Sequence, residues 1–239
     1  MANKVFSDAK VSIIIPVFKS YGIVRRQLLY FKKLNLPETV EIIIMDDGSD
    51  PPIKRNANVI KNCNIYPTGD TRPWTIGCAR NLGAKIADGE YLFFTDIDHI
   101  LTREAIDAVL DFSGDIMRFP RTFAVLDNRG NISIDEQMLF KYGLEKSWFK
   151  RRGRKTVFHV STFAVKKTIF RKMGGFNPAQ CGIGYPSRED RYIDGAYNKQ
   201  RRAGACAPAV WGPEVHVFPR SNRNPMGLFH DLERTRGTI

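Results

Sequence analysis

The stretch from Gly77 to Asp98 reads GCARNLGAKIADGEYLFFTDID and contains the elements that decide the fold. Thr75–Ala87 reads as a helix, and Asp88-Gly89 after it predicts a turn. Glu90–Thr95 is a short apolar run, typical of a buried parallel strand, and it ends in Asp96-Ile97-Asp98. The stretch therefore predicts a helix followed by a buried strand that ends in two carboxylates.

The same alternation of strand and helix occupies the chain before this stretch. Val11–Phe18 (VSIIIPVF) and Glu41–Met45 (EIIIM) are apolar, β-branched runs, and Tyr21–Leu34 has apolar residues at helical spacing. A further helix, capped by Thr102, is expected to run to about Leu110. This order predicts an α/β fold with a Rossmann-like, doubly wound and mostly parallel sheet. Such sheets bind ligands beyond the carboxyl ends of their strands.

The second half of the sequence is less regular. Asp115–Val125 and Lys155–Val165 are expected to add strands, and Ser187–Arg202 reads as a helix that ends at Gly204. Phe149–Lys155 is a basic run, expected to be a solvated loop. The sequence thus predicts one domain with two halves and a tail: a ligand-binding half over 1–112, a smaller second half over 113–218 and a basic tail over 219–239.

Composition limits the partners and the compartment. The 239 residues carry a formal net charge of +12, which favours an anionic partner such as nucleic acid, an acidic glycan, phosphate groups or an anionic membrane surface. The four cysteines form no C-x-x-C pair, so a zinc ribbon is excluded and a reducing, cytoplasmic compartment is expected. No signal-peptide core and no apolar run of about eighteen residues occurs, so only peripheral membrane contact is expected.

The pair Asp96 and Asp98 is the first candidate site. At a strand end the chain turns, so both carboxylates can face a common ligand. Carboxylate oxygens suit Mn²⁺ or Mg²⁺, and such an ion neutralises the charge of a departing diphosphate. The alternative is an acidic loop that caps the helix after Thr102, and a single D-x-D occurs often by chance.

Two further motifs belong to the same predicted edge. Asp46 and Asp47 end the preceding strand, where a carboxylate can accept hydrogen bonds from a base or a ribose hydroxyl. The alternative is an ordinary Asp-Gly turn with Gly48. Arg80 lies in the helix of the opening stretch and could clamp a phosphate, or could instead be a solvated helical arginine.

The ordered set SIIIPVF, IIMDDGSD and GCARNLGAKIADGEYLFFTDID resembles the nucleotide-sugar-binding half of family 2 glycosyltransferases of the GT-A fold, over about Val11 to Ile100. The resemblance implies that Phe18 borders the base, that Asp98 binds the metal, and that Asp96 binds the ribose or the metal. It implies nucleotide-sugar contacts at six positions: Pro16, Phe18, Asp46, Asp47, Arg80 and Asp96.

A later segment, Met173–Asn177 followed by Arg188-Glu189-Asp190, is similar to the G-G-F…E-D pattern of inverting, galactosyltransferase-type enzymes. The resemblance implies that Asp190 is the general base and that Glu189 helps to hold the acceptor. Ser187 to Asp190 also reads as a helix capping box. Residues 182–188 depart from the family's aromatic, glycine-rich sequence, which leaves the acceptor class open.

The segment Glu214–Phe218 resembles the H-V-F element of several GT-A enzymes, which implies that His216 completes the metal site. A neutral imidazole suits Mn²⁺ better than Mg²⁺, although a histidine in an apolar run is often a core residue. Trp74 and Trp211 flank these motifs, and Trp211 is a candidate for contact with an acceptor sugar, although tryptophan is more often simply packed.

The sequence therefore predicts an inverting, metal-dependent glycosyltransferase with a nucleotide-sugar donor. The resembled enzymes mostly use UDP-sugars, and GDP- or dTDP-sugars stay open. The acceptor is expected to be a glycan or polysaccharide; hydroxymethylated DNA, contacted by basic runs such as Lys199–Arg202, and a protein side chain are alternatives. An inactive GT-A domain that binds an anionic polymer is a further alternative. A nucleotidyltransferase is disfavoured because Pro16–Ser20 lacks the glycines of a phosphate loop.

Overall fold

The computed structural model describes residues 9–54, 60–72, 75–142, 155–156, 161–181 and 189–218. Its first part contains β1 (Val11–Val17), α1 (Tyr21–Leu34), β2 (Val40–Asp46), β3 (Cys63–Pro67), α2 (Ile76–Ile86), β4 (Tyr91–Phe94), β5 (His99–Ile100) and α3 (Arg103–Leu110). Its second part contains β6 (Ile116–Arg118), β7 (Arg121–Phe123), β8 (Val125–Leu126), β9 (Ile132–Ser133), α4 (Glu136–Lys141), β10 (Lys155–Thr156), β11 (Phe163–Lys166), α6 (Lys167–Met173), η1 (Pro178–Gln180), α7 (Glu189–Arg202), β12 (Val210–Trp211) and β13 (Val215–Val217).

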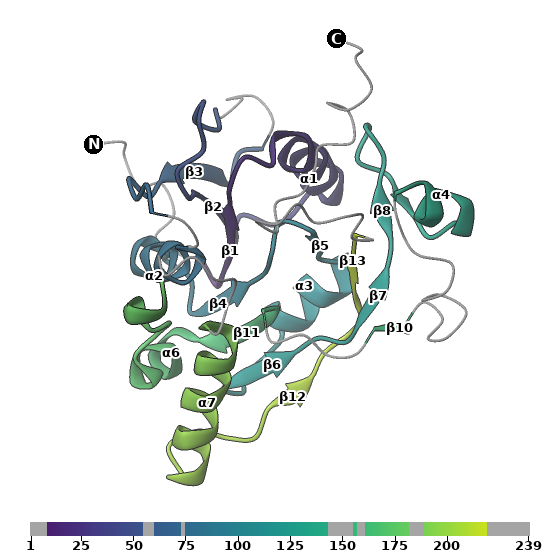
Figure 1. The fold of residues 1–239 in the computed structure, drawn as a ribbon. Coiled ribbons are helices and arrows are strands. Elements are labelled where there is room, and N and C mark those ends of the chain that lie inside the picture. Colours follow the sequence, from purple (N-terminus) through teal and green to yellow (C-terminus); the bar gives the residue numbers. More distant parts are fainter. Residues whose placement is uncertain are drawn as a thin grey trace.

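A seven-stranded sheet forms the centre of the molecule, in the order β12-β6-β11-β4-β1-β2-β3 (Figure 1). β1 pairs in parallel with β2 and β4, and β2 pairs in parallel with β3. β11 is antiparallel to both β4 and β6, whereas β12 is parallel to β6. The α/β class and the mostly parallel sheet are thus confirmed, and both predicted halves contribute strands to one sheet.

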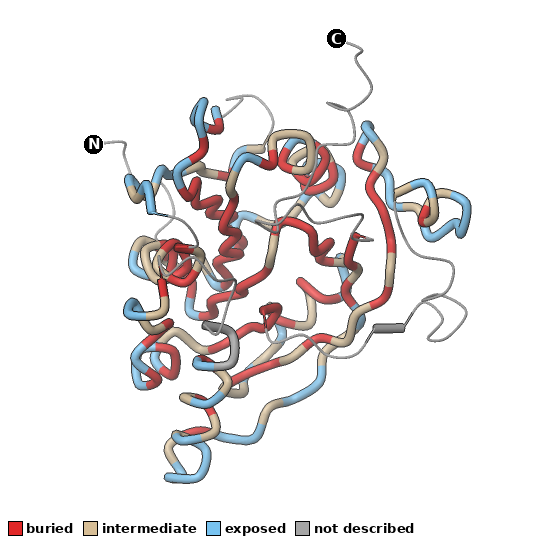
Figure 2. The backbone as a smooth tube through the Cα atoms, viewed as in Figure 1, coloured by how far each residue is buried: buried red, intermediate tan, exposed pale blue. Residues whose placement is uncertain are grey.

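Helices cover both faces of this sheet, so its central strands are buried throughout (Figure 2). Ile13 and Ile15 of β1 pack on the face that α1 and α3 cover, and Ile14 packs on the face of α2, α6 and α7. Strands buried on both faces need apolar side chains at every position. This requirement explains the continuous apolar runs of β1 and β2.

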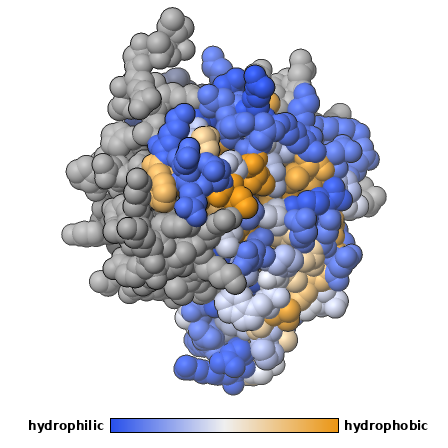
Figure 3. All heavy atoms as spheres, turned by 90° about the vertical axis from the view of Figure 1, so that its right-hand side faces the viewer, coloured by the Kyte–Doolittle hydropathy of each residue, from blue (hydrophilic) through white to orange (hydrophobic). Residues whose placement is uncertain are grey.

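A second, four-stranded sheet has the order β10-β7-β13-β5. β13 is antiparallel to β5 and parallel to β7. β5 directly follows the Asp96–Asp98 turn, so this small sheet holds one end of the turn while β4 holds the other. Figure 3 views the molecule from the side of β7 and α4, where apolar surface lies between hydrophilic borders.

Most of the regular elements agree with the predicted ones. The bounds of α1 are those predicted, and α3 begins after Thr102, whose Oγ1 accepts a hydrogen bond from the Ala105 N–H at 3.1 Å. Gly204 lies just after α7 with φ +68°, as its predicted capping role requires. The sequence did not predict β3, β5, β9, β12, α4, α6 or η1. The basic run at 149–154, the cap at Ser187 and the tail over 219–239 lie outside the described residues.

Among the described residues, no helix has the length and apolar character that a membrane crossing requires.

Candidate active site

The carboxyl ends of β1, β2 and β4 meet at one edge of the large sheet. All three strands are parallel, and the Asp47 N–H donates to the Val17 carbonyl at 2.8 Å across the ends of β1 and β2. The residues that follow these strands, Phe18, Asp47 and Asp96, therefore lie along the same edge. This is the edge at which parallel α/β sheets bind ligands.

The side chain of Asp46 stabilises the loop that follows β2. Its side chain is 3% exposed, and its two carboxylate oxygens accept from the Ser49 N–H at 3.0 Å and the Ile53 N–H at 2.8 Å. Gly48 in the same loop has φ +84°, and a Cβ there would lie 2.6 Å from the Asp70 carbonyl oxygen. The predicted Asp-Gly turn is therefore present, and Asp46 stabilises it.

Asp47, in contrast, directs its carboxylate towards side-chain hydroxyls. Thr75, just before α2, donates to Asp47 Oδ1, and Thr68 donates to the same atom at 3.4 Å. Asp47 is 5% exposed, and burial raises the pKa of its carboxyl above the usual 3.8. Two hydroxyl donors use only part of the acceptor capacity of a carboxylate, so Asp47 can also accept from a ligand N–H or O–H.

Arg80 is buried, so of the two alternatives left open by the sequence, the solvated helical arginine is excluded. Its side chain is 1% exposed and forms an ion pair with Asp96. Its guanidinium lies 5.1 Å from the centre of the Phe176 ring, within the range of a cation–π contact. The next residue, Asn81, exchanges two hydrogen bonds with the backbone of Phe176, at 2.7 Å and 2.9 Å. The segment after α6 thereby fixes the orientation of Arg80.

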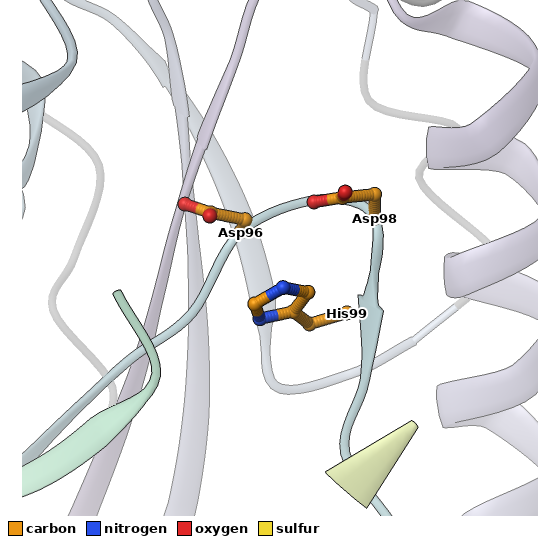
Figure 4. A group of neighbouring side chains, drawn as sticks. All are labelled: Asp96, Asp98 and His99. Carbon is orange, nitrogen blue, oxygen red and sulfur yellow. The ribbon is translucent and has the colours of Figure 1, made fainter. Parts of the chain in front are cut away.

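The turn after β4 brings three potential metal ligands together. One ligand atom each from Asp96, Asp98 and His99 lies within 4.8 Å of the others (Figure 4). The carboxylate of Asp98 points towards Asp96, and the ring of His99 lies beside both. Gln27 of α1 holds this turn, because its Nε2 donates to the carbonyls of Ile97 at 3.0 Å and of His99 at 2.7 Å.

The ring of His99 is engaged at both nitrogens. Its Nε2 lies 2.7 Å from Nη1 of Arg121, and its Nδ1 contacts Oγ1 of Thr162. Arginine can only donate, so Nε2 accepts, and the ring hydrogen is on Nδ1, where it is donated to Thr162. The Nε2 lone pair therefore points at Arg121. The two carboxylates fit a hard cation such as Mn²⁺ or Mg²⁺, and His99 is better suited to hold the turn than to bind the ion.

His216, predicted as a metal ligand, does not belong to this three-residue group. It lies on β13 opposite Ile100 of β5, and its Nδ1 is 2.7 Å from Oγ1 of Thr122. Burial lowers the pKa of His216, so its ring is neutral near pH 7. The Phe218 N–H donates to the Asp98 carbonyl at 2.8 Å, which ties β13 to the acidic turn two residues from His216.

The predicted catalytic and acceptor residues lie in the second half. Glu189 and Asp190 form the first turn of α7, where the structure describes the backbone. Trp211 ends β12 and is 60% exposed. Pro16 lies within β1 opposite Met45, and Phe18 is half-buried. Trp74 lies outside the described residues.

Several residues that support the site were not predicted from the sequence: Gln27, Asn81, His99, Arg121 and Thr162. His99 directly follows Asp98 and could have been considered as part of the motif. The other four make hydrogen bonds that span 22 or more positions along the chain, and no local pattern marks them.

Comparison with known sequences identifies related proteins. Residues 12–174 match the sequence profile described as Glycosyl transferase family 2. An uncharacterised glycosyltransferase of Rickettsia felis is 32% identical over 114 residues, which are 47% of this chain and 18% of the relative. One from Haemophilus influenzae is 28% identical over 129 residues, 51% of this chain and 50% of the relative. The chain thus spans half or less of the length of these relatives.

Two solved structures have the same fold. The structure of S. aureus TarS 1–349 in complex with UDP-GlcNAc has a TM-score of 0.59 at 16% identity, covering 92% of this chain and 61% of TarS 1–349. The mannosyltransferase PcManGT of Pyrobaculum calidifontis, in complex with GDP-Man and Mn²⁺, has a TM-score of 0.54 at 17% identity, covering 87% of this chain and 56% of that protein. The profile match ends at residue 174, so the galactosyltransferase-like character of the later segment stays a prediction.

Proposed function

Because the chain belongs to glycosyl transferase family 2, we propose that it transfers a sugar from a nucleoside diphosphate sugar to a hydroxyl of a glycan, with inversion and with a divalent metal ion. The observation that carries the proposal is the arrangement at the sheet edge. Asp96 and Asp98 lie together there, and a buried arginine, Arg80, pairs with Asp96. UDP is the preferred nucleotide, in line with the UDP-GlcNAc complex of TarS.

Different residues along the edge bind different parts of the donor. Asp47 accepts hydrogen bonds from the base or the ribose, and Phe18 borders the base. Arg80 supplies a fixed positive charge beside Asp96, where the diphosphate needs electrostatic stabilisation. A guanidinium that is already oriented by Phe176 loses little conformational freedom when it meets phosphate oxygens.

The transfer itself requires a base on the acceptor side. Asp190 takes the proton of the acceptor hydroxyl while that oxygen forms a bond to the anomeric carbon. The bond between the anomeric carbon and the diphosphate oxygen breaks on the opposite face, and its electron pair leaves with the nucleoside diphosphate. One displacement of this kind inverts the anomeric centre. Glu189, next to Asp190, helps to hold the acceptor.

Asp96 and Asp98 are proposed to hold the metal, with His216, which lies outside the group of Asp96, Asp98 and His99 in this structure, as a further ligand. The bound ion would neutralise the negative charge that develops on the diphosphate. His216 engages Thr122 through Nδ1, which leaves Nε2 for the ion, as in metal sites where the second ring nitrogen fixes the ligand's orientation. Mn²⁺ suits this mixed oxygen and nitrogen set better than Mg²⁺ does.

The test is release of nucleotide from a panel of UDP-, GDP- and dTDP-sugars by the purified protein, with Mn²⁺ and with EDTA. We expect Mn²⁺-dependent release from one donor, and loss of that release in Asp98→Asn. Asp190→Asn should retain donor binding and lose transfer to an acceptor. If no donor is hydrolysed and UDP gives no metal-dependent thermal shift, the assignment of Asp96, Asp98 and His216 is wrong and the inactive, polymer-binding alternative is favoured.

Hydroxymethylated DNA is a second candidate acceptor, because the net charge of +12 favours a polyanion. It belongs in the acceptor screen beside neutral glycans and a peptide. Transfer to DNA that weakens steeply with salt would select it over the glycan. No disulfide joins the cysteines that the structure describes, Cys63, Cys78, Cys181 and Cys206, and we propose a reducing compartment such as the cytoplasm.

A further inference from the structure

A single row of residues crosses the large sheet from the acidic turn to its far edge. Phe94 of β4 lies opposite Phe163 of β11, which lies opposite Arg118 of β6, which lies opposite Trp211 of β12. β6 and β12 have the same direction as β4, because β11 is antiparallel to both β4 and β6. Arg118 and Trp211 therefore end their strands at the ligand-binding edge.

Trp211 points to the face of the sheet that α7 covers. In a parallel pair, residues opposite each other point to the same face. Arg118 points to α7, because it pairs with Asp194 and its guanidinium lies 5.1 Å from the centre of the Tyr197 ring. Val210, one residue before Trp211, points to the other face. Trp211 thus lies on the side of α7, the helix whose first turn contains Asp190.

The exposure of Trp211 is unusual for its residue type. Tryptophan is highly buried on average, yet this side chain is 60% exposed, more than any other large hydrophobic residue among those described. The face of an indole ring is apolar and electron-rich, so it packs well against the C–H face of a pyranose ring. Arg118, opposite Trp211 in the sheet, and Asp194, which pairs with Arg118, offer donors and an acceptor for sugar hydroxyls.

The charge around Trp211 favours an uncharged ligand. Arg118, which lies opposite Trp211 in the sheet, is ion-paired with Asp194, so these two charges offset each other, and the sequence from Ala203 to Phe218 adds no Lys or Arg. A surface that binds a nucleic-acid backbone carries Lys or Arg at the phosphates. An exposed tryptophan whose neighbouring arginine is already paired with a carboxylate is therefore a poorer site for DNA than for a neutral sugar.

The separation of the two sites sets the minimum size of that ligand. Three strand steps of about 4.8 Å place the backbone of Trp211 about 14 Å from Phe94, two residues before Asp96. One pyranose ring cannot contact both Trp211 and a donor sugar bound at Asp96. A chain of several sugar units can do so.

We propose that Trp211, with the Arg118–Asp194 pair, is an acceptor subsite for an inner sugar ring of an uncharged oligosaccharide whose terminal hydroxyl reacts near Asp96. This inference rests on the proposed glycosyltransferase function, and it selects the neutral glycan among the candidate acceptors. The subsite makes affinity depend on the length of the acceptor, because a monosaccharide occupies only the reacting position.

The experiment compares oligosaccharides of one to four units. Uncharged series of glucose, galactose, mannose and N-acetylglucosamine are titrated calorimetrically into the full chain with UDP and Mn²⁺. In at least one series we expect the trisaccharide to bind at least tenfold more tightly than the monosaccharide. Trp211→Ala should remove this gain, Trp211→Phe should retain part of it, and Val210→Ala, on the opposite face, should retain all of it. Thermal melting verifies that each variant is folded.

The outcomes separate the subsite from the reaction. A gain with length that survives in Trp211→Ala, or the absence of any such gain in all four series, overturns the subsite. Mn²⁺-dependent hydrolysis of the donor by the wild-type protein and by Val210→Ala tests the proposed function independently. If hydrolysis fails while binding that depends on both length and Trp211 persists, the enzymatic proposal is wrong and the sugar site stands.

Discussion

Asn81 and Phe176 are joined by two hydrogen bonds, from Asn81 Nδ2 to the Phe176 carbonyl at 2.7 Å and from the Phe176 N–H to Asn81 Oδ1 at 2.9 Å. The side-chain amide thus pairs with a backbone peptide as a neighbouring strand would. Phe176 in turn lies under the guanidinium of Arg80. The segment that leads towards the proposed base is therefore fixed to the helix that carries the proposed diphosphate ligand.

A matched pair of glycine variants tests this link. Gly174 and Gly175 have φ +82° and +69°, so alanine is strained at both, by about 1–2 kcal/mol. A Cβ at Gly175 would also lie 2.6 Å from Asn81 Oδ1, whereas a Cβ at Gly174 would have no neighbour within 4 Å. We expect Gly175→Ala to lower the free energy of unfolding in urea by about 1–3 kcal/mol more than Gly174→Ala does. Equal losses would contradict the proposed importance of the Asn81 link.

Arg80→Lys should be costly although the charge is kept. Lysine lacks the planar fork that pairs with Asp96 and stacks on Phe176 in a site where Arg80 is 1% exposed. We expect a loss of about 1–3 kcal/mol in urea unfolding. The donor kcat/KM should fall as well. Arg103→Lys, in an exposed pair with Asp107, is the control and should change stability by less than about 0.5 kcal/mol.

Asp47→Asn should make the protein more stable at pH 7 and weaken its binding of nucleotide. Burial raises the pKa of Asp47 above 3.8, so the unfolded chain releases this proton at a lower pH than the folded chain does. The ionisation of Asp47 therefore lowers the stability of the wild-type protein as the pH rises from about 4, and Asp47→Asn lacks this contribution. Its amide oxygen can still accept from Thr75.

Two measurements test Asp47→Asn. In thermal melts, the melting temperature of Asp47→Asn should exceed that of the wild type at pH 7, and this difference should shrink as the pH falls to 4. A lower melting temperature of the variant at pH 7 would show that burial of the Asp47 carboxylate is not destabilising. In UDP titrations, exchanging a charged acceptor for a neutral one should weaken binding by about tenfold. Unchanged UDP affinity would remove Asp47 from the donor site and leave the stability prediction intact.

Gln27→Leu should weaken the acidic turn from outside the site. Leucine is similar in size but leaves the carbonyls of Ile97 and His99 without the Gln27 donor, at a cost of about 1–3 kcal/mol in unfolding experiments. We expect weaker binding of Mn²⁺ in calorimetry, because Asp98 lies between these carbonyls. Gln200→Leu, which removes an exposed hydrogen bond to Lys172, is the control. Wild-type Mn²⁺ affinity in Gln27→Leu would exclude a positioning role.

Local patterns explain which parts of the fold could be predicted. The central strands are continuous apolar runs, and Thr102 is an N-cap whose effect lies within three residues. β3 was missed because Cys63–Pro67 (CNIYP) is a half-exposed edge strand that ends in proline and lacks such a run. β5 has two residues, too few for any periodicity, and forms only because β13 pairs with it.

The site residues that follow the central strands could be predicted, because parallel α/β sheets bind ligands at the carboxyl ends of their strands. Asp47, Asp96 and Asp98 follow buried strands, so the sequence placed them at one edge. The contact of His99 with Thr162 spans 63 positions, and that of Gln27 with Ile97 spans 70. Such contacts depend on how helices and strands pack in space, and a single sequence does not encode them locally. The burial of Arg80 was missed for the same reason.

The position of β11 limits how the molecule can be recombined. β11 comes from the second half of the chain but lies between β4 and β6, and it gives β4 its second neighbour. A chain truncated near residue 112 would leave β4 as an unpaired edge beside the acidic turn, and exposed apolar edge strands aggregate. In a chimaera joined there, β4 of one parent must pair with β11 of the other, so an exchange of acceptor specificity should move β6, β11 and β12 together with α7 and preserve the register of β11 on β4.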